Sequence, residues 1–149
     1  MRTEDEAFNQ WWQDQWSDYK TDITFTLGIE PLSADDEHAA LAMPFRPEIA
    51  QATGFFSAGA LIQLADNAAT VLCMRTAASR GQDGFPYTVQ MSAQLVANTN
   101  SGRAIARATL ISAGRSVMAA ETRVTDESGR LLLLLTSTHV VRSKTPEPK

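Results

Sequence analysis

Ser57-Ala-Gly-Ala-Leu-Ile-Gln-Leu-Ala-Asp-Asn-Ala-Ala-Thr-Val-Leu-Cys-Met74 is the stretch of sequence that decides the fold. Its apolar residues recur at three- and four-residue spacing, which predicts one long helix over residues 57–79. Because this helix is almost uncharged, it needs a large apolar surface to cover it. The apolar stripe comprises Leu61, Leu64, Ala65, Ala68, Val71 and Leu72.

The segments on either side of this helix have the patterns of strands. Two strands are expected before the helix and four after it, and short Asn/Ser/Gly connections indicate antiparallel hairpins. We therefore expect an α+β protein, a curved antiparallel sheet of about six strands around one long central helix. The expected strands are residues 21–30, 37–45, 87–97, 103–112, 115–125 and 130–142, with a turn at 31–36.

An aromatic cluster lies within residues 1–20, which we expect to form an extra N-terminal helical segment. Two interpretations stay open: a packing helix that closes a hydrophobic opening, or an aromatic lid over an acyl or aryl substrate. Most of these side chains can share one face of a short helix. The cluster consists of Phe8, Trp11, Trp12, Trp16 and Tyr19.

Length and composition indicate one globular unit. A chain of 149 residues suits a single domain, which we expect to span residues 1–142. Residues 143–149 are rich in Pro, Lys and Glu, a composition typical of a disordered tail. A net charge of −4 lacks the basic balance of a nucleic-acid binder.

The cellular location is predicted from three features. The lone Cys73 excludes an internal disulfide framework and is typical of a reducing compartment. The acidic N-terminus lacks the apolar core of an export signal. The longest apolar stretch includes Gln63, Asp66 and Asn67 and is too polar for a good membrane span. We expect a cytoplasmic protein.

Asp66 is the only formally charged side chain between Glu48 and Arg75. Burying a carboxylate costs free energy unless a partner or a function compensates. A desolvated acid is also suited to base or nucleophile chemistry. Taken alone, Asp66 could equally be a structural acid.

The sequence around Asp66 resembles that of a known family. Gly54-Phe-Phe-Ser-Ala-Gly-Ala-Leu-Ile-Gln-Leu-Ala-Asp-Asn-Ala-Ala-Thr70 is similar to the helix signature of hotdog thioesterases of the phenylacetate-degradation and 4-hydroxybenzoyl-CoA type. The resemblance covers roughly residues 40–142 and implies the hotdog fold. Ser57 stands where the family usually has histidine, and Ala58 where it has glycine.

The resemblance implies a catalytic set. Asp66 lies where the family has its catalytic carboxylate, as general base or nucleophile. Ala58 and Gly59 match the helix N-terminal positions whose N–H groups polarise the thioester carbonyl, as N–H groups there are suited to do. Gln51 and Thr70 match positions that hold the attacking water.

Four further residues are expected to bind substrate. Thr88 matches a water-holding serine or threonine, and Phe56 is expected to contact the acyl or aryl group. Arg115 is a candidate for the coenzyme A phosphates. Ser57 is expected near the substrate as a helix N-cap rather than as a nucleophile, because Ser is a preferred cap.

The implied reaction is hydrolysis of an acyl-CoA or aryl-CoA thioester to a carboxylic acid and free coenzyme A, without a metal or redox cofactor. The resemblance also implies a homodimer or a dimer of dimers. A non-catalytic acyl-CoA-binding protein is the alternative. A hydratase or dehydratase is less favoured, because His38 and His139 are expected to be surface or sheet histidines and none lies on the helix. Cys73 is expected to be a small buried hydrophobe.

Overall fold

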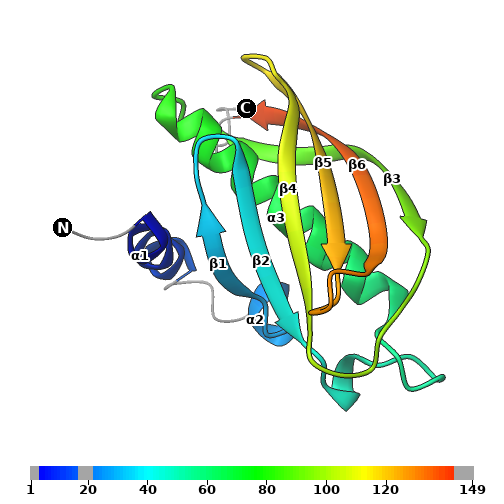
Figure 1. The fold of residues 1–149 in the computed structure, drawn as a ribbon. Helices are drawn as coiled ribbons and strands as arrows, with labels where there is room; N and C mark the ends of the chain where they lie inside the picture. Colours follow the sequence, from blue (N-terminus) through cyan, green and yellow to red (C-terminus); the bar gives the residue numbers. More distant parts are fainter. Residues whose placement is uncertain (1–3, 17–21, 143–149) are drawn as a thin grey trace, which may run out of the picture.

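The computed structural model of this chain, which describes residues 4–16 and 22–142, is a six-stranded antiparallel sheet curved around one long helix (Figure 1). The strand order is β1-β2-β4-β5-β6-β3, so β1 and β3 are the edges. This is the expected hotdog architecture. The strands are β1 Glu30–Ala34, β2 His38–Pro44, β3 Phe85–Leu95, β4 Arg103–Ala113, β5 Val117–Thr125 and β6 Leu131–Arg142.

The central helix, α3, spans Ala58–Ser79 with Ser57 at the N-cap position, which confirms the predicted helix. Leu61, Leu64 and Leu72 are completely buried against the sheet. Burying a leucine side chain is worth roughly 1.5–3 kcal/mol, so this stripe supplies much of the free energy that holds helix to sheet. Small residues between the leucines, such as Ala65 and Ala68, let the backbone approach the strands closely.

The first predicted strand, 21–30, is wrong. Residues Ile23–Thr26 form a short helix, α2, whose N-terminus is capped by the Asp22 carboxylate, which accepts a hydrogen bond of 2.8 Å from the Thr24 N–H. Gly28 then turns the chain with a φ of 68°, which favours glycine. The sequence alternation was misleading because it does not mark one buried face.

The predicted turn at 31–36 is also wrong in its first part, because β1 runs through Pro31. Proline is tolerated there because β1 is an edge strand and has one side without a partner. The other five predicted strands are confirmed, with ends shifted by a few residues. A 3-10 turn, η1 Pro47–Ile49, lies in the connection before α3.

The N-terminal helix, α1, spans Glu4–Trp16 and lies beside β1 at the sheet edge (Figure 1). Phe8 and Trp12 are buried and belong to the main hydrophobic core. This placement supports the packing interpretation for these two side chains rather than the aromatic lid. Tyr19 and the predicted tail at 143–149 lie outside the described residues.

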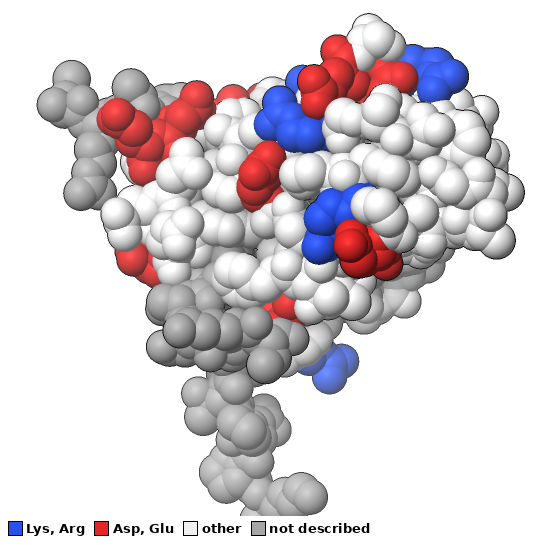
Figure 2. Space-filling view, turned by 90° about the horizontal axis from the view of Figure 1, so that it is seen from below, with Lys and Arg blue, Asp and Glu red and all other residues white. Residues whose placement is uncertain are grey.

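Charged side chains are scattered over the face shown in Figure 2, with acids and bases interspersed and a broad uncharged area beside them. On this face the described residues form no extended basic patch of the kind that binds a phosphate backbone. Within residues 4–16 and 22–142, no helix is long and apolar enough to cross a membrane.

Candidate active site

A cavity of about 290 Å³ opens beside the middle of α3. Its walls come from α3, from the start of β3 and from α2. Asp66, Thr70 and Thr88 all line it, together with the aromatic side chains of Phe85 and Tyr87. The structure thus brings together three of the residues singled out in the sequence.

Asp66 is half-buried in this wall and is held by β3. The Thr88 hydroxyl donates a hydrogen bond of 2.7 Å to Asp66 Oδ1. The register of β3 against β6 shifts directly after Thr88, between Thr88 and Gln90, as in a β-bulge. Bulges re-aim the side chains of a strand, and this one directly follows the residue whose hydroxyl contacts Asp66.

His139 lies directly behind Thr88 and was not predicted as a site residue. It is completely buried, and its Nδ1 lies 3.3 Å from Thr88 Oγ1 while its Nε2 lies 2.8 Å from Ser137 Oγ. His139 was expected to be a surface or sheet histidine. It does lie in a strand, β6, but it is buried rather than on the surface. The alternation along β6 was the signal in the sequence that His139 is buried, because Leu133, Leu135 and Ser137 are buried on the same face.

The surroundings of Asp66 shift the pKa of two neighbours. Burial lowers the pKa of His139 from its usual 6.5, although the charge of Asp66 and the Pro86 carbonyl act in the opposite direction. Burial, reinforced by the negative charge of Asp66, raises the pKa of the Cys73 thiol to about 12. At neutral pH both side chains are therefore uncharged, and Cys73 is the expected buried hydrophobe.

A second hydrogen-bonded chain fixes α2 against α3. Gln63 Nε2 donates to Asn67 Oδ1, and Asn67 Nδ2 donates to Thr24 Oγ1 at 2.8 Å. Asn67 follows Asp66 directly in the sequence, so this chain holds the α2 wall of the cavity in place.

A neighbouring cavity of about 340 Å³ lies at the N-terminus of α3 and is lined by Ser57 and Gly59. The first helical hydrogen bond there is donated by the Leu61 N–H to the Ser57 carbonyl at 3.1 Å. The exposed Ala58 and Gly59 therefore present free N–H groups, as the first turn of a helix does. Ser57 is at the N-cap position, but its hydroxyl makes no capping hydrogen bond.

Ile23 and Gln63 line both cavities, so the two cavities lie side by side along α3, and together they are referred to as the groove along α3. The helix rises 1.5 Å per residue, which separates Ala58 from Asp66 by about 12 Å along the axis. This span is too long for one thioester carbonyl to contact the Ala58 N–H and the Asp66 carboxylate of the same chain.

Three predicted residues lie away from this groove. Gln51 is exposed in the loop before α3, where its Nε2 donates to Thr53 Oγ1 at 2.9 Å. Phe56 is completely buried and packs edge-on against Phe45, so its side chain belongs to the core. Arg115 lies in the β4–β5 turn, where its carbonyl accepts a hydrogen bond from Gln82.

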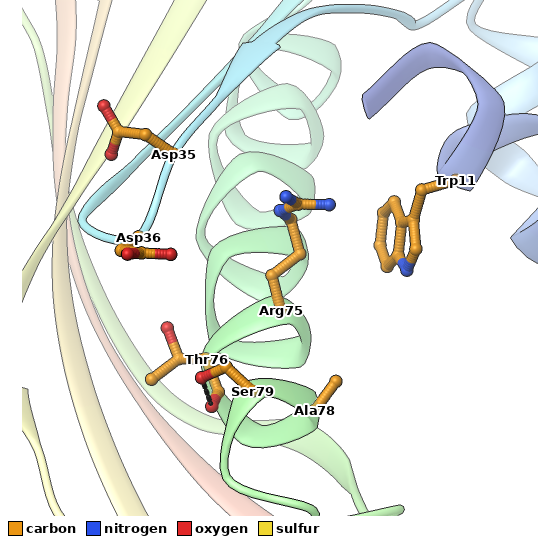
Figure 3. Close-up of a pocket in the computed structure, with 7 residues that line it drawn as sticks. All are labelled: Trp11, Asp35, Asp36, Arg75, Thr76, Ala78 and Ser79. Carbon is orange, nitrogen blue, oxygen red and sulfur yellow. Dashed lines mark hydrogen bonds between the residues drawn. The ribbon is translucent and has the colours of Figure 1, made fainter. Parts of the chain in front are cut away.

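A further pocket of about 190 Å³ lies between α1, the β1–β2 turn and the C-terminal part of α3 (Figure 3). The guanidinium of Arg75 has Asp35 and Asp36 on one side and Trp11 on the other. It lies 5.3 Å from the centre of the Trp11 indole ring. Asp66 and Thr88 do not line this pocket. It therefore lies apart from the groove along α3.

Comparison with known proteins agrees with this architecture. The family model of the thioesterase superfamily matches residues 53–133. A 1,4-dihydroxy-2-naphthoyl-CoA hydrolase of Listeria monocytogenes is 28% identical over 119 residues, which covers 80% of this chain and 94% of the relative.

Two solved structures show the same fold. A thioesterase from Haemophilus influenzae matches with a TM-score of 0.81 at 20% identity, covering 100% of this chain and 96% of that one. The PaaI protein of the Escherichia coli phenylacetic acid degradation operon matches with a TM-score of 0.77 at 18% identity, covering 90% and 94%. The chain therefore belongs to the thioesterase superfamily and is a hotdog-fold thioester hydrolase.

Proposed function

We propose that the protein hydrolyses an acyl-CoA or aryl-CoA thioester to a carboxylic acid and free coenzyme A, with Asp66 as the catalytic carboxylate. The observation that carries this proposal is the position of Asp66, half-buried in the cavity wall and hydrogen-bonded by Thr88. A partly desolvated carboxylate with a fixed orientation is suited to act as general base or as nucleophile.

The reaction requires two groups that act on one carbonyl. As base, Asp66 takes a proton from water while the water oxygen attacks the thioester carbon. The carbonyl oxygen becomes an oxyanion, the carbon–sulfur bond then breaks, and the sulfur leaves as a thiolate that takes up a proton. As nucleophile, Asp66 instead displaces the thiolate and forms an anhydride that water hydrolyses. Thr70 and Thr88 line the cavity where the water would lie.

The oxyanion needs N–H donors, and the free N–H groups of Ala58 and Gly59 are suited to that role. Because they lie about 12 Å along α3 from Asp66, we propose that they come from a second copy of the chain. Each active site would then combine Asp66 of one protomer with the helix N-terminus of its partner. The expected homodimer, alone or in pairs, follows from this requirement.

The edge strand β3 is the proposed contact between the copies. None of its eleven residues is charged. Its apolar side chains are unusually exposed, with Val89 58% and Tyr87 48% accessible. An uncharged exposed edge is a template for pairing with another strand. Since Tyr87 and Thr88 also line the Asp66 cavity, pairing along β3 would place the partner beside the reacting carbonyl.

Aryl-CoA esters are the substrates we favour. Phe85 and Tyr87 form an edge-to-face pair, 4.9 Å between ring centres, in the cavity wall. Such a pair provides an apolar surface on which a planar ring can pack. The Listeria relative is named for a naphthoyl-CoA substrate. We propose that water is the only co-substrate, with no metal or redox cofactor, and that the protein acts in the cytoplasm.

The proposal is tested by measuring release of the coenzyme A thiol from short, medium, long-chain and aryl CoA esters, including 1,4-dihydroxy-2-naphthoyl-CoA. Asp66→Asn keeps the size of the side chain but removes the base. It should lower kcat by roughly 10²–10⁴-fold. Asp36→Asn, which removes an exposed acid outside the groove, is the matched control and should leave turnover unchanged.

Two results would contradict parts of this proposal. Binding of CoA esters without turnover of any of them would support the non-catalytic alternative, which Ser57 in place of the family histidine suggests. Full activity of Asp66→Asn would leave the reaction intact but remove Asp66 from its mechanism.

A further inference from the structure

His139 is a buried, ionisable side chain to which the proposed mechanism assigns no role. Four side chains follow one another across the sheet and helix: Ser137, His139, Thr88 and Asp66. The hydrogen-bonding distances between successive members are 2.8, 3.3 and 2.7 Å. Only Asp66 and Thr88 line the cavity, so His139 and Ser137 form the part of this chain that is buried behind it.

The contacts select one tautomer of His139. The single hydrogen of the Thr88 hydroxyl is donated to Asp66 Oδ1, so Thr88 Oγ1 is an acceptor towards His139. The Pro86 carbonyl oxygen, 3.4 Å from the same Nδ1, can also only accept. A hydrogen on Nδ1 satisfies both acceptors, and the bare Nε2 then accepts the hydrogen of Ser137. The opposite tautomer would turn a lone pair of Nδ1 towards the Pro86 carbonyl.

We infer that His139 is a positioning residue, whose Nδ1–H fixes the direction of the Thr88 hydroxyl so that this hydroxyl donates to the ionised Asp66. The inference rests on the proposed role of Asp66 in thioester hydrolysis. Without the histidine, the hydroxyl is free to rotate away from the carboxylate. With it, Asp66 keeps one orientation and one hydrogen bond that stabilises its charged form.

The burial of His139 supports this role. Burial lowers the pKa of the imidazole, so the ring stays neutral at pH 7 and keeps one donor and one acceptor. Other ionisable groups face the same region from each side: Cys73 from α3, Tyr87 from β3 and Asp22 from the α2 cap. Burial holds the Cys73 thiol protonated, and none of these groups makes a hydrogen bond with Asp66 or His139 among those found in the described residues.

The inference is tested with a matched pair of variants. His139→Asn keeps an N–H donor near the position of Nδ1. His139→Leu places a side chain of similar shape to Asn at the same position, but without a donor. Both lose the partner of Ser137, so that loss cancels in the comparison. His139→Leu should lower kcat about tenfold with little change in KM. The acidic limb of its kcat/KM profile should move to higher pH by about one unit, because the ionised form of the base loses a hydrogen bond. His139→Asn should restore the wild-type profile.

A double-mutant cycle shows whether His139 acts through Thr88. In a Thr88→Val background, where the hydroxyl is already absent, His139→Leu should change neither kcat nor the position of the acidic limb any further. Full additivity of the two substitutions overturns the inference, as does an unshifted profile in an active His139→Leu enzyme. If the wild type turns over no thioester at all, the proposed function itself fails.

One measurement does not depend on activity or on the folding of variants. The ring ¹⁵N chemical shifts of His139 in the wild-type protein at pH 7 should show a neutral imidazole with hydrogen on Nδ1 and none on Nε2. A hydrogen on Nε2, or a charged imidazolium, overturns the inference directly.

Discussion

The Thr88 hydroxyl donates a 2.7 Å hydrogen bond to Asp66 Oδ1 and so joins the edge strand β3 to the middle of α3. The two residues are 22 positions apart, and only the folded sheet brings them together. A change at Thr88 should therefore alter the chemistry at Asp66 while leaving the core of α3 untouched.

Thr88→Val, which keeps the shape of the side chain but removes the hydroxyl, should lower kcat by roughly 10- to 150-fold, since a hydrogen bond to a charged group is worth roughly 1.5–3 kcal/mol. Thr88→Ser keeps the hydroxyl and should retain most of the activity. The measurement is steady-state thiol release with both variants. Full activity of Thr88→Val, with a loss only in Thr88→Ser, would indicate that packing of the methyl group, rather than the hydrogen bond, matters.

The position of Asp66 on a long helix under a sheet could be predicted because both signals are local: apolar spacing over residues 57–79 and short turns between the later strands. The hydrogen-bonding partners of Asp66 could not be predicted in this way. The contacts of Thr88 and His139 depend on the register between β3 and β6 and on the bulge after Thr88, and no local pattern encodes these. The α2 error has a different origin, since a local cap at Asp22 overrides the alternation that follows it.

Stability should fall as the solution becomes acidic, because burial lowers the pKa of His139 below its usual 6.5. In this pH range the unfolded chain takes up a proton that the folded chain excludes, so the free energy of unfolding decreases below about pH 6.5, by at most about 1.4 kcal/mol per pH unit. Urea unfolding at pH 7.5 and 5.5 measures the change. His139→Asn should show a smaller decrease, and an equal decrease in both proteins would assign it to other groups.

Cys73 should be unreactive in the folded protein. It is completely buried, and its thiol pKa is raised to about 12, so little thiolate forms at pH 8. Iodoacetamide should modify the native protein very slowly and the urea-unfolded protein completely, as mass spectrometry of this single-cysteine chain will show. Rapid stoichiometric modification without urea would contradict the burial of Cys73.

Phe56 and Phe55 allow the core to be separated from the substrate site. Phe56 is completely buried against Phe45, so Phe56→Ala should lower the free energy of unfolding by about 3–5 kcal/mol with KM unchanged in the folded fraction. Phe55→Ala, at a side chain 37% exposed, is the control and should cost far less. A raised KM without loss of stability would instead assign Phe56 to the substrate site, as its sequence position suggested.

A mixing experiment tests whether each active site uses two copies of the chain. Ala58→Pro removes the N–H proposed for the oxyanion, and proline is tolerated at the first helical position. Ser57 already has the extended backbone that precedes proline, with ψ of 134°. Ala58→Pro and Asp66→Asn should each be nearly inactive alone.

When these two variants are mixed and allowed to exchange subunits, the mixed dimers hold one intact site. That site combines Asp66 of the Ala58→Pro chain with the Ala58 N–H of the Asp66→Asn chain. Statistical exchange should therefore restore about one quarter of the wild-type activity. A third variant, Val89→Lys, places a charge on the exposed β3 edge and should both separate the copies and abolish turnover. Light scattering measures the first effect and thiol release the second. If activity does not recover on mixing, although mass measurements verify subunit exchange, then the active site does not combine Asp66 of one copy with the helix N-terminus of the other.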